Sequence, residues 1–254
     1  MIPDADRPVT SAKDPRLEQW VERSRGDGDL VVVDGPKLVR EALAAKLPAE
    51  LLLLGELSDE DAGAIARAAA GIATLRIEGR LERKLTDTAS PRGAVLLAKK
   101  PDAAPLPPAT SGAFLAVLDG IQDPGNAGGI VRAAYAFGAA AVVFAAGTAR
   151  PFSPKVVRAS AGTILRIPAC TATAEDLDAA GWRTLLLDGD SAVAIDAPLP
   201  DGGVAVVVGS EGQGLSGAFR GEARSIPTVR PIESLAALSA ASIAFHSVAR
   251  PRKR

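Results

Sequence analysis

A buried apolar run that leads through a glycine-rich loop into a helix constrains the fold more than any other feature. The apolar run Ala113–Leu118 predicts a buried strand bounded by turn residues. Asp123-Pro124-Gly125 predicts a tight loop, and apolar residues at helical spacing across 127–137 predict a helix with Arg132 in its first turns. Backbone donors, the Asn126 amide and the Arg132 guanidinium would then lie near one another. This predicts a site for an anion or polar ligand, although an ordinary turn capped by Asn126 fits the same spacing.

Composition excludes several classes of site. The chain has 254 residues, 47% of them hydrophobic, which is enough for one large domain or two modest ones. Its single cysteine, Cys170, and single histidine, His246, exclude a structural zinc site and an intrachain disulfide, and we predict no metal. The sequence has no G-x-x-x-x-G-K-[ST] motif and no G-x-G-x-x-G after a strand. Both absences argue against common nucleotide-binding folds.

The distribution of charged and apolar residues favours a soluble protein. The first residues are charged, and no 18-residue apolar span is free of charge, so we expect a cytoplasmic protein that does not contact membranes. We expect Trp20 and Trp182 to be packing residues and His246 to be an ordinary helix residue. Cys170 is expected to be a small buried group.

Alternating strand and helix patterns divide the chain in two. The first hundred residues predict a small α/β domain, after about 12 residues that we expect to be disordered. Its strands are expected at 30–33, 51–54, 73–77 and 94–98, and its helices at 15–21, 37–46, 59–70 and 80–85. Asp14 and Ser58 are expected to cap two of these helices. The proline-rich segment 101–108 predicts a linker, so the expected domains are 1–105, with the linker at about 101–110, and 106–254.

The second domain predicts a parallel sheet. Strands are expected at 114–118, 141–144, 183–187 and 204–208, and helices at 127–137, 154–161, 174–180 and 235–249. The run Val204–Val208 is apolar throughout, which is typical of a parallel strand covered on both faces.

Two further loops follow strands of this domain. Gly209–Ser216 comes directly after the apolar run, and its glycines allow a ligand to approach the backbone beside the Glu211 carboxylate. Ile226–Leu235 leads into the last helix. Ligands gather at the carboxyl ends of strands in such sheets, so the loops support one another as parts of one site. Plainer interpretations are a helix cap at Ser216 and another at Ser234.

Basic residues are concentrated locally, although the formal net charge is only −1. The segment from Pro124 to Ala174 has five basic residues and no acidic one; they are Arg132, Arg150, Lys155, Arg158 and Arg166. This asymmetry predicts a surface that meets phosphates, and we expect Arg150, Lys155 and Arg158 to contact RNA. The basic tail Arg250–Arg254 is either a disordered end or a second RNA contact.

The three loops together resemble those of a known family. Asp119–Arg132 reads D-x-x-x-D-P-x-N-x-G-x-x-x-R, which resembles motif one of the SpoU/TrmH family of SPOUT RNA methyltransferases. Gly209–Ser216 is similar to its motif two, and Ile226–Leu235 to its motif three. Phe152–Gly162 is similar to the stretch between motifs one and two, and Val33–Ala42 more weakly to the family's RNA-binding domain.

This resemblance implies a function and a fold. It implies methyl transfer from S-adenosyl-L-methionine to an RNA ribose 2′-hydroxyl, with ribosomal RNA as our expected substrate. It also implies a C-terminal SPOUT domain with a trefoil knot, a small N-terminal α/β RNA-binding domain, and a homodimer with composite active sites.

The resemblance also implies roles for individual residues. Arg132 matches the catalytic arginine, and Asn126 and Glu211 match residues that shape the site. The positions that hold the cofactor are Gly209, Ile226, Ser234 and Leu235.

One position departs from the family. Motif three usually contains S-L-N-V-S, whereas this chain has Ser234-Leu235-Ala236-Ala237-Leu238. The Asn side chain missing at Ala236 would provide a donor and an acceptor near the cofactor. Either neighbouring groups compensate or activity is weakened, so a catalytically weak RNA-binding relative is an alternative. A methyltransferase acting on transfer RNA is another.

Overall fold

The computed structural model describes residues 7–249, which form two compact units. Residues 7–101 and Phe152–Arg166 form the first unit, and Asp102–Pro151 and 167–249 form the second. The first break lies at the start of the proline-rich segment. We expected 152–166 within the second domain, but the structure groups these residues with the first unit. The predicted basic tail, Arg250–Arg254, lies outside the described residues.

The first unit contains a four-stranded mixed sheet in the order β1-β4-β2-β3. Its strands are β1 (Leu30–Asp34), β2 (Ala49–Leu54), β3 (Thr74–Arg76) and β4 (Ala94–Lys99). β4 is antiparallel to β1 and β2, and β3 runs parallel to β2. Leucine and valine side chains of these strands form the core with Leu17 and Trp20 from the first helix. The predicted small α/β architecture is confirmed.

The helices of the first unit are α1 (Pro15–Arg23), α2 (Pro36–Ala44), α3 (Asp59–Ala68), α4 (Gly79–Thr86) and α6 (Pro154–Ala159), followed by a 3-10 turn at Thr163–Leu165. The side chains of Asp14 and Ser58 cap α1 and α3 as predicted. The expected disorder up to about residue 12 was wrong at Val9. This side chain is fully buried, and its backbone N–H donates to the Arg76 carbonyl at 2.8 Å.

The second unit contains a six-stranded sheet in the order β10-β8-β9-β5-β6-β7, with every neighbouring pair parallel. Its strands are β5 (Phe114–Asp119), β6 (Ala141–Phe144), β7 (Ala169–Cys170), β8 (Arg183–Leu187), β9 (Val204–Gly209) and β10 (Glu222–Arg224). β5 and β9 lie at the centre and bury nearly every side chain. The α/β class and the parallel sheet are confirmed. β7 and β10 were not predicted, because two or three residues are too short for a periodic pattern.

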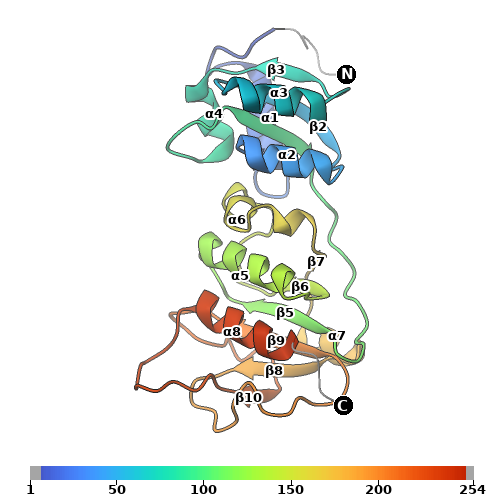
Figure 1. Cartoon of the computed structure of the whole chain (residues 1–254), viewed down its shortest axis with the longest axis vertical. Helices are drawn as coiled ribbons and strands as arrows, with labels where there is room; N and C mark the ends of the chain where they lie inside the picture. Colours follow the sequence, from blue (N-terminus) through green and yellow to red (C-terminus); the bar gives the residue numbers. More distant parts are fainter. Residues whose placement is uncertain (1–6, 250–254) are drawn as a thin grey trace. The chain divides into compact units, whose positions relative to one another are not determined.

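The helices of the second unit are α5 (Pro124–Ala136), α7 (Ala174–Ala179) and α8 (Ala237–Ala249). α5 and α8 pack against each other over the central strands (Figure 1). Asp123 caps α5 by accepting a hydrogen bond from the Asn126 N–H at 2.8 Å, so the alternative of Asn126 as cap was wrong. Ser216 precedes no helix, and α8 begins at Ala237, so neither Ser216 nor Ser234 is a helix cap.

The single-residue expectations for packing are confirmed. Trp20 and Trp182 are buried, and Trp182 Nε1 donates to the Pro107 carbonyl at 2.7 Å. Cys170 is buried in β7, and burial raises the pKa of its thiol to about 11. His246 lies in α8 with its ring at the edge of Phe137. No helix among residues 7–249 combines the length and apolarity that crossing a membrane requires.

Candidate functional site

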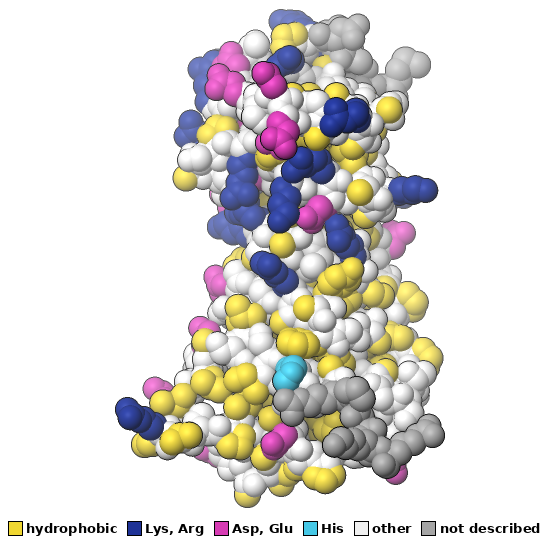
Figure 2. Space-filling model, viewed as in Figure 1, with side chains coloured by type: hydrophobic (Ala, Val, Ile, Leu, Met, Phe, Trp, Pro, Cys, Tyr) yellow, Lys and Arg dark blue, Asp and Glu magenta, His cyan; other side chains and the backbone are white. Residues whose placement is uncertain are grey.

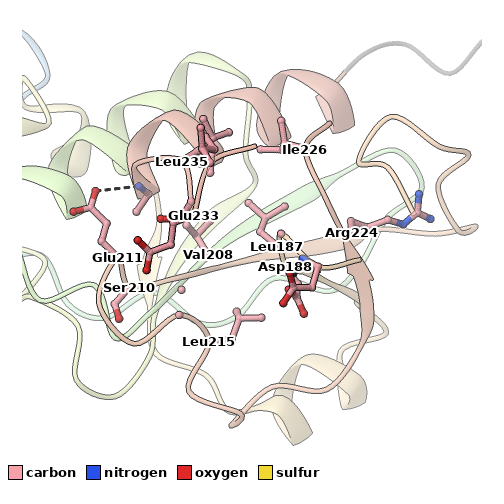
Figure 3. Close-up of a pocket in the computed structure, with 18 of the residues that line it drawn as sticks. Leu187, Asp188, Val208, Ser210, Glu211, Leu215, Arg224, Ile226, Glu233 and Leu235 are labelled. Atoms are coloured by element: carbon pink, nitrogen blue, oxygen red, sulfur yellow. Dashed lines mark hydrogen bonds between the residues drawn. The ribbon is translucent and has the colours of Figure 1, made fainter. Parts of the chain in front are cut away.

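A cavity of about 480 Å³ opens in the second unit where β8, β9 and β10 end. Gly209 and Ser234 line it. Ile226, Leu235 and Glu211 line it as well and are labelled in Figure 3. Residues separated by as many as 53 positions in the sequence, from Leu187 to Ala240, therefore share one pocket. Cavities of this size commonly bind small molecules and cofactors, and the carboxyl ends of parallel strands are their usual place.

The loop after β9 has a backbone that requires glycine at its start. A Cβ atom on Gly209 would lie 2.4 Å from the backbone carbon and oxygen of Gly214. The loop closes through two hydrogen bonds of 2.9 Å, in which the backbone N–H groups of Ser210 and Gly214 each donate to the other residue's carbonyl. Gly214 has a φ of +65°, which glycine adopts without strain. The loop is thus a compact turn with its backbone against the cavity.

Asp119 connects the loop after β5 with the loop after β9. Its side chain is buried at the end of β5, and its Oδ2 accepts a hydrogen bond from the Ser216 N–H at 2.7 Å. A carboxylate that accepts from a backbone N–H makes a stronger bond than a neutral acceptor does. The first residue of the D-x-x-x-D-P motif therefore holds the second motif in place.

Glu211 connects the loop after β9 with α8. Its Oε1 accepts a hydrogen bond from the Ala237 N–H at 3.1 Å, drawn as a dashed line in Figure 3. Ala236 is the N-cap residue of α8, because its carbonyl accepts the first intrahelical hydrogen bond from the Ala240 N–H. Alanine has no side-chain acceptor, so the Glu211 carboxylate takes one of the free donors at this helix end.

The sequence analysis missed three charged cavity residues that lie outside the predicted loops. Asp188 and Asp190 follow β8 directly, and Arg224 ends β10. The Asp188 N–H donates to the Arg224 carbonyl at 3.0 Å, and its Oδ1 accepts from the Asp190 N–H at 3.0 Å. The position of Asp188 after a predicted strand was the available signal, because the same rule identified the other loops.

The Arg224 side chain is turned away from the cavity (Figure 3). Its guanidinium donates to the carbonyls of Ala194 and Pro198 and pairs with Glu222 at 2.9 Å. The charged groups that line the cavity itself are therefore carboxylates, from Asp188, Asp190, Glu211 and Glu233. This lining favours a ligand that carries positive charge and hydrogen-bond donors.

Arg132 and Asn126 do not line this cavity. Arg132 is exposed in the third turn of α5, and Asn126 is half-buried in the first turn. Within one chain, the structure brings together the predicted cofactor positions and Glu211, but it does not bring the predicted catalytic arginine to them.

The other basic residues divide between the units. Arg150 is exposed in the loop after β6, in the second unit. Lys155, Arg158 and Arg166 belong to the first unit, where they pair with Asp87 at 3.1 Å, Asp34 at 3.5 Å and Glu41 at 3.5 Å. The segment from Pro124 to Ala174 contains no acidic residue, but in the folded protein acidic residues from the first hundred positions pair with these three basic side chains.

Known proteins are similar to this chain over nearly its whole length. The model of the SpoU rRNA Methylase family matches residues 113–246. An uncharacterised tRNA/rRNA methyltransferase of Mycobacterium sp. (strain KMS) is 31% identical, over 99% of this chain and 85% of its own. One of Mycolicibacterium vanbaalenii is 33% identical, over 96% and 83%.

Two solved structures have the same fold. The AdoMet-bound rRNA methyltransferase from Sinorhizobium meliloti is 24% identical and superimposes with a TM-score of 0.81, covering 96% of this chain and 97% of that one. The SpoU methyltransferase AviRb from Streptomyces viridochromogenes in complex with AdoMet is 23% identical, with a TM-score of 0.79, and covers 93% and 97%.

Proposed function

Because this chain belongs to the SpoU rRNA methylase family, we propose that it is an enzyme that transfers a methyl group from S-adenosyl-L-methionine to a ribose 2′-hydroxyl of RNA. One observation carries this proposal. The loop after β9 and the segment before α8 meet in one cavity, and the family's cofactor-holding positions, Gly209, Ile226, Ser234 and Leu235, all line it. The relatives named above as tRNA/rRNA methyltransferases support RNA as the substrate.

The cavity residues fit S-adenosyl-L-methionine. When bound, this cofactor supplies a methyl group carried on a positively charged sulfur. The carboxylates at the cavity favour that charge, and the glycine backbone at Gly209 allows a close approach. Leu187, Ile226 and Leu235 provide apolar surface for the rest of the molecule. The AdoMet-bound relatives of the same fold support this assignment.

We propose that Arg132 contributes to catalysis by stabilising negative charge. Methyl transfer needs the ribose oxygen in line with the methyl carbon, so positioning dominates. A guanidinium stays protonated in proteins, which makes it a poor base but a strong donor to an oxygen that develops negative charge. Glu211 then shapes the site by holding α8 against the loop after β9. We assign Asn126, in the first turn of the same helix as Arg132, to shaping the site; its backbone N–H donates to the Asp123 side chain that caps α5.

The family resemblance implies a homodimer with composite active sites, so we propose that a second copy of the chain contributes its Arg132 to the cavity. α5, which carries Arg132, packs on α8, and both helices expose a large apolar side chain: Tyr135 and Ile243 are each 41% exposed. Exposed apolar residues on adjacent helices favour a partner of the same kind. We also propose that the segment after β10 forms the family's trefoil knot before α8 returns to pack on β5, β9 and α5.

We propose ribosomal RNA as the substrate and the cytoplasm as the location. The name of the SpoU rRNA methylase family and that of the Sinorhizobium meliloti rRNA methyltransferase support ribosomal RNA. Transfer RNA is the second candidate, because the mycobacterial relatives are named for both. The Glu211 contact beside Ala236 supports an active enzyme over a catalytically weak relative, since a neighbouring group compensates at the helix end.

Two measurements test the activity. Calorimetric titration with S-adenosyl-L-methionine should give saturable heat, and its absence would favour an RNA-binding relative without catalysis. Transfer of a labelled methyl group to RNA should then occur with the parent and fall at least about a hundredfold with Arg132→Ala, because removing one donor to a developing oxyanion costs about this much. Full activity in Arg132→Ala would remove this residue from the mechanism.

A further inference from the structure

Two buried carboxylates of the first unit hold one arginine. The Glu82 side chain is fully buried in α4, and its Oε1 accepts hydrogen bonds from the backbone N–H groups of Arg92 at 2.6 Å and Gly93 at 3.2 Å. The Asp34 side chain, 1% exposed at the end of β1, has its Oδ2 3.8 Å from Arg92 Nε. Both the backbone and the side chain of Arg92 are thus held from inside the unit.

A second arginine reaches the same carboxylate from α6. One terminal nitrogen of Arg158 lies 3.5 Å from Asp34 Oδ2 and donates to the Thr86 carbonyl at 3.3 Å. Oδ2 of Asp34 therefore lies within ion-pair distance of two guanidinium groups. The other carboxylate oxygen, Oδ1, is buried and has no hydrogen-bond partner among the described residues.

The backbone at Gly35 leaves room for this arrangement. Gly35 has a φ of +98°, and a Cβ there would lie 3.1 Å from Arg92 Cδ. A larger residue would be strained and would press on the arginine side chain. Burying a carboxylate costs free energy unless it is paired. A surface arginine does not need a buried carboxylate for folding, so folding alone does not explain this arrangement.

Both arginine side chains remain partly exposed. The Arg92 side chain is 48% exposed and that of Arg158 is 24% exposed. Beyond the contacts given above, their guanidinium nitrogens donate no hydrogen bond to another described residue. Lys155 lies one turn before Arg158 on α6 and is also exposed. Figure 2 shows Lys and Arg side chains gathered over the part of the first unit that contains α2 and α6.

We propose that Arg92 and Arg158 form a phosphate-binding pair for the RNA backbone, with Asp34 as the residue that positions both. The assignment rests on the proposed function, which provides RNA as the partner. Asp34 meets both guanidinium groups through one oxygen, which leaves other guanidinium nitrogens for a ligand, and their planar forks match the oxygens of a phosphate. Such contacts set affinity and its salt dependence without reading the base sequence.

The test measures the affinity of the full chain for a fluorescein-labelled 30-nucleotide stem-loop RNA, by fluorescence anisotropy between 50 and 200 mM salt. Arg92→Ala and Arg158→Ala should each lower affinity about three- to tenfold and reduce the slope of log affinity against log salt by about one. Arg80→Ala is the matched control, because Arg80 is an exposed arginine of the same unit paired with Glu78. It should change affinity less than about twofold.

Asp34→Asn tests positioning separately. It should change RNA affinity by at least about threefold in the parent and by less than about 1.5-fold in the Arg92→Ala/Arg158→Ala variant, because its effect passes through the arginines. An unchanged circular dichroism spectrum and melting temperature show that a variant is folded, because the mutated residues lie in the first unit and the cofactor cavity in the second. If the parent binds the cofactor but no RNA, the proposed function fails. If the parent binds RNA and the arginine variants behave like Arg80→Ala, only this inference fails.

Discussion

Glu211 and Ala237 join two loops of the cavity through a single hydrogen bond of 3.1 Å, from the Ala237 N–H to the Glu211 carboxylate. The bond lies one residue from Ala236, where the family usually has asparagine. It satisfies one donor of α8, but no side chain among residues 7–249 caps the N–H groups of Leu238 and Ser239 in the same turn.

Ala236→Asn should therefore stabilise the protein. An Asn side chain at the N-cap accepts a hydrogen bond from the second or third N–H of the helix, and exchanging Ala for Asn there contributes about 1 kcal/mol. For a chain of this size the melting temperature should rise by about 2–4 °C. Thermal unfolding followed by circular dichroism measures this. Ala236→Val is the control because valine cannot cap, and an equal rise in that variant would contradict the explanation.

Glu211→Ala should weaken cofactor binding without abolishing it. Losing a hydrogen bond to a helix N-terminus costs about 1 kcal/mol, which corresponds to about fivefold in affinity if the loop after β9 then moves freely. Titration calorimetry with S-adenosyl-L-methionine gives this value. Glu211→Gln should lie between the parent and Glu211→Ala, since the amide oxygen still accepts. Parent-like affinity in Glu211→Ala would mean that the contact does not organise the cavity.

Gly209→Ala should damage the cavity more strongly. The new methyl group would overlap backbone atoms of Gly214 that have no room to move, which costs on the order of 1–3 kcal/mol. Cofactor affinity should fall at least about tenfold, because the loop must open to accommodate the methyl group. Gly212→Ala, in the same loop, meets no atom within 4 Å and should bind the cofactor normally. Similar losses in both variants would point to general loop sensitivity instead.

Asp34 should make stability depend on pH in an unusual direction. Burial raises the pKa of Asp34 to about 6, with the nearby Glu82 carboxylate acting in the same sense and Arg92 and Arg158 opposing it. The folded state then holds a proton that the unfolded chain releases near pH 4, so this contribution is fully present below pH 4 and lost as pH rises through 6.

Asp34→Asn should remove this pH dependence. Its free energy of unfolding, relative to that of the parent, should increase by about 2 kcal/mol between pH 4 and pH 7. Urea unfolding at both pH values measures the difference. Asp29→Asn is a suitable control, because Asp29 is exposed and its pKa is lowered by its hydrogen bond to Arg23. A difference between Asp34→Asn and the parent that stays constant with pH would contradict the assignment.

Much of the cavity was predictable because its parts are local in sequence. The apolar run before Gly209 marks a strand end, and a glycine-rich loop there leaves few alternatives for the backbone. The N-caps at Asp14 and Ser58 followed from the same local logic. Asp123 was missed as the cap of α5 because Asn126, three residues later, is an equally good capping type.

The remaining features depend on contacts between distant residues. Nothing near Arg158 indicates that Asp34, 124 positions earlier, pairs with it. The sequence also gives no sign that Phe152–Arg166 belongs to the first unit, because the helix pattern of this segment is compatible with either unit. β10 was too short to predict from the sequence, so the position of Arg224 beside the cavity could not be predicted either.

Mass-spectrometric mapping of ribose methylation tests the central claim most directly. Ribosomal RNA from cells that lack the gene should be incubated with the purified protein and S-adenosyl-L-methionine, and its fragments compared with those treated with Arg132→Ala. We predict one additional 2′-O-methylated nucleotide with the parent protein and none with the variant. A parent protein that binds the cofactor but leaves every ribose unmethylated in both ribosomal and transfer RNA would contradict the account.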